Sequence, residues 1–441
     1  MKDALNRTEE IVEKAKSLGA DEVVATTTFG KYRQVRFSNN QVDITLSWND
    51  YSTGIVLSWK KRLVATEIHN FLDIDATLKQ SLKLAKVSQE SPTFGGFAKG
   101  SFHYAKSKFD KNIEDVENLT DYVSEAIEAA RREAGPKIDS GGILFTKFEN
   151  VYFASSEGPA GTDTRSAIEL SIRAFSEREA SGHGVECSST LKEFEPSKAG
   201  RKAGEIAKMA KDPRIGDEGV YDVVFDPLIF GSLLGVWSGM VSAYSVLTRT
   251  SVFVGKLGKK VAPETVTLKD NPAPYSMANR VFDDEGVPTR ENVFIDHGVL
   301  KTYLHNTSTA KLFKTETTAN AGLISPTPWN AEMEAGDMGK EELFQEMKRG
   351  LYLTNTWYTR FQNSAKGDFS TIPRDGIFLI ENGEIKQSLK DLRISDNVLS
   401  MLGNIEGISK EGQHVHWWAE VDTPALSRYV HMKNVHMTKS K

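Results

Sequence analysis

Residues 227–248 read PLIFGSLLGVWSGMVSAYSVLT and contain no Asp, Glu, Lys, Arg or His, although 26% of the 441-residue chain is charged. The apolar content predicts a helix over about Leu228–Ser245 that packs inside a domain. Its length would also suit a membrane span. Its serines, its glycines and Tyr244 dilute it, however, and β-patterned sequence lies on both sides. We therefore expect a buried or interface helix, which can neither ligate a metal nor transfer a proton.

The sequence around this helix predicts an α+β protein. Residues 1–90 form an N-terminal α+β domain, 91–108 a linker or loop, 109–217 a middle α/β domain, and 218–441 a β-rich domain with a curled or barrel-like antiparallel sheet around the central helix. The N-terminal strands are expected at Glu22–Thr28, Tyr32–Phe37, Val42–Trp48, Gly54–Ser58 and Leu63–Ile68, and the middle strands at Gly142–Phe148, Val151–Ser155 and Ala167–Phe175. Helices are expected at 3–18, 110–134, 196–210 and 340–349.

Two segments of the C-terminal half predict β-hairpins. Residues 295–300 (IDHGVL) and 380–385 (IENGEI) each place a glycine between β-branched strands, at the position that needs a positive φ. The segment 91–108 is rich in Gly, Ser and Lys, but its four aromatic residues predict that it docks on the rest of the molecule.

The composition argues against several classes of protein and of binding site. The net charge of −5 and the pI of about 6.1 give no basic surface for nucleic acid. A single cysteine, Cys187, rules out an intramolecular disulfide and a zinc site made from a cysteine pair. The charged N-terminus lacks an apolar signal segment, so we expect a cytoplasmic protein that does not enter a membrane.

Three further segments carry a family resemblance. They are TSVFVGKLGKKVAPETVTLKDNP (250–272), FDDEGVPTRENVFIDHGVLKTYL (282–304) and GDFSTIPRDGIFLIENGEI (367–385). In order and spacing they resemble the C-terminal half of the TldD/PmbA family, the modulators of DNA gyrase. The metal-bearing subunit of that family has a His-Glu-x-x-x-His helix before this block and a cysteine ligand in a Cys-Gly-Lys-x-Gly-Gln segment.

The resemblance places the three helix ligands at Leu234, Gly235 and Gly239, and the cysteine at Ile408. None of these can bind zinc through its side chain. The resemblance therefore implies a metal-less, PmbA/TldE-type subunit without a cofactor of its own. It also implies a heterodimer with a zinc-containing, TldD-like homologue that encloses a cavity and degrades unfolded proteins or peptides. A homodimer is expected to be possible in isolation.

Other residues keep two alternatives open, a stand-alone homodimeric modulator that binds peptides or proteins and a divergent hydrolase. Asp283, Asp284 and Glu285 could hold a cation or a peptide amino-terminus, or could form a solvated turn. His414 and His416 stand two residues apart, so a strand would point both imidazoles at one ion, with Glu420 nearby. The alternative to a metal site is a β-strand whose side chains line a pocket or an interface.

Three weaker patterns complete the set. The loop 364–370 (SAKGDFS) could suggest a Ser/Lys hydrolase, but a loop that shapes the chamber wall or contacts a partner, with Asp368 as its acidic residue, is favoured. His183 and Cys187 would need a third group to act as a nucleophilic pair. The segment 256–260 (KLGKK) lacks the spacing of a Walker motif.

Overall fold

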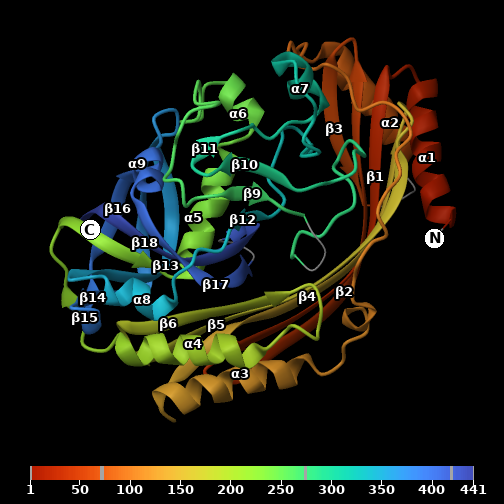
Figure 1. Ribbon diagram of the computed structural model, residues 1–441. Coiled ribbons are helices and arrows are strands. Elements are labelled where there is room, and N and C mark those ends of the chain that lie inside the picture. The colour runs from red at the N-terminus through yellow and green to blue at the C-terminus, as the bar shows by residue number, and fades with distance from the viewer. Residues whose placement is uncertain (1, 70–73, 273–275, 418–420, 441) are drawn as a thin grey trace.

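The computed structural model describes residues 2–69, 74–272, 276–417 and 421–440. Its strands form two sheets, one in the N-terminal half of the chain and one in the C-terminal half (Figure 1). Helices pack on both sheets, which confirms the predicted α+β class. Within the described ranges, no helix is long and apolar enough to cross a membrane.

The N-terminal sheet is antiparallel throughout, in the order β3-β2-β1-β4-β5-β6. Its strands are β1 (Glu22–Ser38), β2 (Gln41–Trp59), β3 (Arg62–Ile68), β4 (Asp139–Ser155), β5 (Ala160–Glu177) and β6 (Ala180–Ser188). The sequence predicts two short strands in place of each of β1, β2 and β4, and these breaks are wrong. Gly30, at one of them, pairs with Asp50 on one side and Glu149 on the other, so the ladder holds the chain extended there.

This sheet joins the units predicted at 1–90 and 109–217. Strand β1 pairs with β4 from Val24↔Ser155 to Phe37↔Gly142, although more than a hundred residues separate the partners. The sheet curves, with four helices on its outer side and the C-terminal half on its inner side (Figure 1). The four helices are α1 (Lys2–Ser17), α2 (Ile74–Val87), α3 (Leu119–Ala134) and α4 (Pro196–Met209).

Helix α3 begins later than the sequence predicts. A single 3-10 turn, η1 (Lys111–Ile113), comes first. The chain after this turn is held by the sheet. The guanidinium of Arg33, on β1, donates to the carbonyls of Glu114 and Val116 at 2.9 and 3.0 Å. These bonds to the sheet hold the two carbonyls where the helix was predicted to have begun.

The C-terminal sheet is mixed and strongly curled. Its order is β11-β10-β9-β12-β18-β8-β13-β14-β15-β7, with β16 paired to β14 and β18, and β17 paired to β18. Three of its pairs, β12–β18, β13–β8 and β15–β7, are parallel, unlike the purely antiparallel sheet predicted. The strands are β7 (Arg214–Ile215), β8 (Gly219–Phe225), β9 (Leu268–Asp270), β10 (Asn292–Asp296), β11 (Val299–Leu300), β12 (Ala331–Met333), β13 (Arg349–Asn363), β14 (Asp368–Glu381), β15 (Glu384–Lys390), β16 (Leu392–Asn397), β17 (Ile405–Trp417) and β18 (Val421–Lys439).

The apolar stretch at 227–248 forms two helices instead of the one predicted. Helix α5 (Pro227–Gly239) lies against β18 and is buried along nearly its whole length, and a turn at Met240 leads into α6 (Ala243–Leu247). The glycines of the stretch lower its helix propensity. At the turn, the Met240 carbonyl accepts a hydrogen bond from the Ser251 hydroxyl at 2.6 Å. The smaller helices are α7 (Thr307–Phe313), α8 (Lys340–Gln345) and α9 (Val398–Gly403).

Local expectations about turns and docking are confirmed. His297-Gly298 and Asn382-Gly383 all have positive φ, and they connect β10 to β11 and β14 to β15. The aromatic loop after α2 packs on the inner face of the N-terminal sheet, where Phe97 is buried with Phe282.

Candidate functional site

Helix α5 carries the positions that the resemblance assigns to metal ligands. Leu234 and Ile408 are both buried in the main apolar cluster of the C-terminal half, at 0% and 3% exposure. A methyl group on Gly235 would meet Thr423 at 3.3 Å, whereas Gly239 has free space beside it. Zinc needs three or four nitrogen, sulfur or oxygen ligands. These four side chains supply none, so the residues present do not fit a metal ion at this place.

An ionic network fixes the start of α5. Asp226 caps the helix by accepting from the Leu228 amide, and Pro227 occupies the first turn. The second carboxylate oxygen of Asp226 lies 2.6 Å from the Lys202 ammonium and 2.5 Å from the Tyr352 hydroxyl. Lys202, on α4, also donates to the hydroxyls of Tyr352 and Tyr429.

This network was missed from the sequence. The only local signal was the Asp-Pro pair at 226–227, which is typical of a helix start. Burial lowers the pKa of Lys202, but Asp226 and the two tyrosines outweigh that effect and raise it well above its usual value. Lys202 is therefore a charged structural cation and is not poised as a nucleophile.

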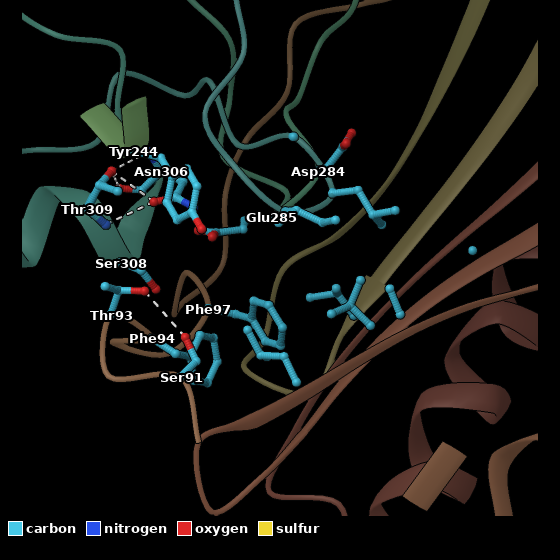
Figure 2. A pocket seen from close by; sticks show the side chains of 18 of the residues that line it. Ser91, Thr93, Phe94, Phe97, Tyr244, Asp284, Glu285, Asn306, Ser308 and Thr309 are labelled. Carbon is cyan, nitrogen blue, oxygen red and sulfur yellow. Dashed lines mark hydrogen bonds between the residues drawn. The ribbon is translucent and has the colours of Figure 1, made fainter. Parts of the chain in front are cut away.

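A cavity of about 400 Å³ lies between the inner face of the N-terminal sheet and the C-terminal half (Figure 2). Its walls include Val24, Val56, Phe94 and Phe97, so much of its lining is apolar. The polar side is formed by Glu285 and by residues at the start of α7, among them Asn306, Ser308 and Thr309. Figure 2 shows the Glu285 side chain directed toward the side where Tyr244 and Asn306 lie. The cavity thus combines an apolar wall with one inward carboxyl group, the pattern of a ligand pocket.

The acidic cluster predicted at 283–285 has three different roles, and the solvated turn considered for it is wrong for Asp283 and Glu285, which are 0% and 5% exposed. Asp283 organises the turn: it accepts from the amides of Glu285, Val287 and Ala321 at 2.9–3.0 Å. Asp284 also borders the cavity, but its carboxylate binds the Arg280 guanidinium at 2.7 Å.

Glu285 is the member of the cluster that faces the cavity, and its carboxylate accepts from the Thr307 amide at 3.2 Å. Burial raises its pKa to about 8, and the charge of Asp283 adds to this effect. Burial likewise raises the pKa of Asp283 to about 7, against the opposing effect of its three amide bonds. At neutral pH the cavity therefore holds a largely protonated Glu285.

The structure does not assemble a metal site from His414 and His416. The ring of His416 lies 2.5 Å from Glu169 on β5, so this imidazole is engaged by a sheet carboxylate. Burial lowers the pKa of His414, and this residue lines a separate cavity of about 730 Å³ beside Gln413. Over the ranges that the structure describes, no group of three or more His, Cys, Asp and Glu side chains is placed to hold a metal ion. Glu420, the suggested partner, lies outside the described residues.

The remaining candidates are structural. His183 bonds Ser171 at 2.8 Å and Asn355 at 2.9 Å. Cys187 lies four residues further along β6, about 13 Å away at strand spacing, and burial raises its thiol pKa. These two residues therefore do not form a nucleophilic pair. Asp368 accepts from Asn397, the N-cap of α9, so it stabilises the start of that helix.

Comparison with known proteins identifies the family. The model of the PmbA/TldA metallopeptidase C-terminal domain matches residues 218–438, and that of the central domain matches residues 110–211. The chain belongs to the PmbA/TldD metallopeptidase family.

Its relatives in this family are named metalloproteases. One from Methanothermobacter thermautotrophicus is 29% identical over 275 residues, which cover 59% of this chain and 60% of the relative. One from Methanocaldococcus jannaschii is 34% identical over 201 residues, 44% of each protein. This chain thus spans about 44–60% of the length of these two relatives.

Two solved structures share the fold. TldE from Thermococcus kodakarensis superposes with a TM-score of 0.84 at 20% identity, over 98% of this chain and 99% of that one. A proposed modulator of a DNA gyrase from Thermotoga maritima gives 0.85 at 23% identity, over 99% and 100% of the two chains.

Proposed function

We propose that this chain is the non-catalytic, TldE/PmbA-type subunit of a TldD/TldE-type metalloprotease complex that acts on unfolded proteins or peptides. One observation carries the proposal. The positions that the resemblance assigns to metal ligands are occupied by Leu234, Gly235, Gly239 and Ile408, which cannot bind zinc through their side chains. Peptide hydrolysis at neutral pH needs an activated water or nucleophile. The zinc that supplies it is assigned to the partner subunit.

The surroundings of α5 support a structural role for this region. Leu234 and Ile408 pack in one apolar cluster, and Asp226 ties the helix start to Lys202. A helix held in this way is well suited to fix the wall of a shared chamber, but it has no group that could move a proton. The buried, unpaired Cys187 agrees with a reducing compartment, and we propose the cytoplasm.

Complex formation tests the assignment. The partner is a homologue that retains an intact His-Glu-x-x-x-His helix. Mixed with this chain, it should elute as a one-to-one complex in size-exclusion chromatography with light scattering. Two species that elute separately at micromolar concentrations would contradict the partnership.

The cavity at Glu285 favours a second candidate function, that of a peptide-binding protein. Its apolar wall suits an apolar side chain, and a peptide amino-terminus would pair with the carboxylate of Glu285. Because Glu285 is largely protonated at pH 7, such binding should release a proton. Calorimetry in buffers of different ionisation enthalpy would detect the release. Equal binding of free and acetylated apolar tripeptides, without proton release, would exclude this mode.

A further inference from the structure

Strands β13 and β14 (Figure 1) carry two aromatic rings that stack with two arginines. Trp357 and Tyr358 lie nearly parallel, with ring centroids 5.3 Å apart and 6° between their planes. The Arg374 guanidinium lies 3.8 Å from the centre of the Trp357 ring, and the Arg360 guanidinium lies 5.1 Å from that of Tyr358. We call these four side chains the arginine–aromatic stack.

A β-bulge brings the two rings of this stack together. Neighbouring residues of a regular strand point to opposite faces of the sheet, so Trp357 and Tyr358 could not stack there. In β13 the register with β14 shifts between Trp357 and Arg360, and Tyr358 has a φ of 58°. A positive φ is unfavourable for a bulky side chain, and bulges often re-aim a side chain at a binding site. The backbone is therefore strained at the point that places both rings side by side.

The arginines of the stack carry charge that the protein does not neutralise. The neighbouring carboxylate, Asp375, is buried and already accepts from Arg173 at 2.5 Å and from Ser181 at 2.6 Å. Within the part of the chain that the structure describes, neither Arg360 nor Arg374 forms an ion pair, and Arg360 is exposed. A guanidinium that stacks on a ring keeps its N–H edge free to bind a carboxylate through two hydrogen bonds.

We propose that the arginine–aromatic stack binds an extended, acidic segment of polypeptide, with one carboxylate at each of its two arginines. The contacts within the stack place the Arg360 and Arg374 guanidinium groups at most about 14 Å apart. In an extended chain, residues two or four positions apart face the same way and lie about 7 or 13 Å apart. Acidic residues at alternate positions can therefore reach both arginines. The Tyr358 side chain, which is 56% exposed, offers its ring to the segment between them.

The choice of polypeptide as the occupant rests on the proposed function, which is action on unfolded proteins or peptides. A single-stranded nucleic acid also combines anions with groups that stack on aromatic rings. It carries a phosphate at every nucleotide, however, and would extend beyond two arginines over a protein whose net charge is −5. A short acidic segment meets the stack alone, so charge complementarity favours the peptide.

Fluorescence anisotropy with the isolated chain tests the site. The probe is a labelled peptide of alternating glutamate and threonine, and its control has glutamine in place of glutamate. The wild type should bind the glutamate peptide at least tenfold more tightly, and added salt should weaken this binding. Arg360→Gln and Arg374→Gln should each weaken it about tenfold, because each removes a charge-assisted contact. Trp357→Leu should also weaken it, although it leaves the charge unchanged. Arg201→Gln, at an exposed position on α4, is the matched control and should bind like the wild type.

Three results would overturn the proposal. The first is equal affinity of the wild type for the two peptides, a comparison that needs no variant. The second is unchanged binding by Arg360→Gln/Arg374→Gln when its melting temperature equals that of the wild type. The third is tighter binding of labelled oligothymidylate that the same double variant loses, which would assign the stack to nucleic acid. Neither a partner subunit nor proteolysis enters this experiment, so a failure of complex formation or of cleavage would be distinguishable from a failure of peptide binding.

Discussion

The Lys202 ammonium lies 2.6 Å from the carboxylate of Asp226, and this contact joins α4 to the first turn of α5. Asp226 is almost fully buried, while about a fifth of the Lys202 side chain stays exposed. The pair therefore links the helical layer on the N-terminal sheet to the central helix of the C-terminal half.

Replacing Asp226 by Asn should be strongly destabilising. The amide can still cap α5, but it leaves the Lys202 ammonium without a counter-charge. Breaking a buried pair in this way costs about 3 kcal/mol or more. Chemical denaturation should show the loss, and the double variant Lys202→Met/Asp226→Asn should recover most of it. A single variant as stable as the wild type would show that the pair contributes little.

Charges placed on α5 or in the turn that follows it should disrupt the fold or the assembly. Val241→Lys puts an ammonium at a position that is 1% exposed, and Gly235→Asp adds both a charge and a contact with Thr423. Each should cost about 3 kcal/mol or more, because the charge finds no partner there. Leu257→Lys, at a position that is 50% exposed, is the control and should leave the melting temperature nearly unchanged. Unaltered melting of both test variants would refute the burial of this segment.

Glu285 should make stability fall as the pH rises. Its folded pKa of about 8 lies above the value for an unfolded glutamate, so the folded state holds this proton where the unfolded state has lost it. The stabilising contribution is therefore complete below about pH 4 and is lost as the pH rises through 8. The difference is on the order of several kcal/mol, because each unit of pKa difference is worth about 1.4 kcal/mol.

Thermal melts from pH 5 to pH 9 check this expectation. Glu285→Gln should lose part of the decline, because its amide does not titrate. Glu316→Gln, an exposed residue just after α7, is the control and should decline like the wild type. Parallel profiles for all three proteins would show that Glu285 is ionised throughout this range.

The isolated chain should bind no stoichiometric zinc. The four positions that the resemblance assigns to ligands are two glycines, a leucine and an isoleucine, and His416 is engaged by Glu169. Elemental analysis after exposure to zinc and desalting would measure the content. One tightly held zinc per chain that disappears in His414→Ala would favour the divergent hydrolase instead.

Much of the fold follows from local sequence patterns. The uncharged stretch at 227–248 predicts its own burial, and the glycines at 298 and 383 predict their hairpins. The lengths of the N-terminal strands do not follow in this way. Gly30 looks like a break in a single sequence, but two neighbouring strands hold it extended, and the partner β4 comes more than a hundred residues later. Such long-range pairing overrides local propensity.

The candidate site was predictable in part. The acidic residues at 283–285 stand out in the sequence, but their different roles depend on what lies beside each carboxyl group. Asp283 meets three backbone amides, Asp284 meets Arg280, and Glu285 faces the cavity. Arg280, Glu285 and Val287 lie in the same segment, but Ala321 and the Thr307 amide at the start of α7 come from elsewhere in the chain. Only the tertiary structure therefore identifies Glu285 as the inward group. The Lys202–Asp226 contact could not be predicted either, because Lys202 lies on α4 and Asp226 lies at the start of α5.

The central claim is that this chain supports proteolysis without performing it. The most direct measurement is the cleavage of an unfolded, casein-like substrate by this chain, by its metal-bearing homologue and by the mixture. We predict background rates for this chain alone and strong cleavage by the mixture that a chelator abolishes. Chelator-sensitive cleavage by this chain alone, free of contaminating protease, would contradict the non-catalytic assignment, and full activity of the homologue alone would contradict the partnership.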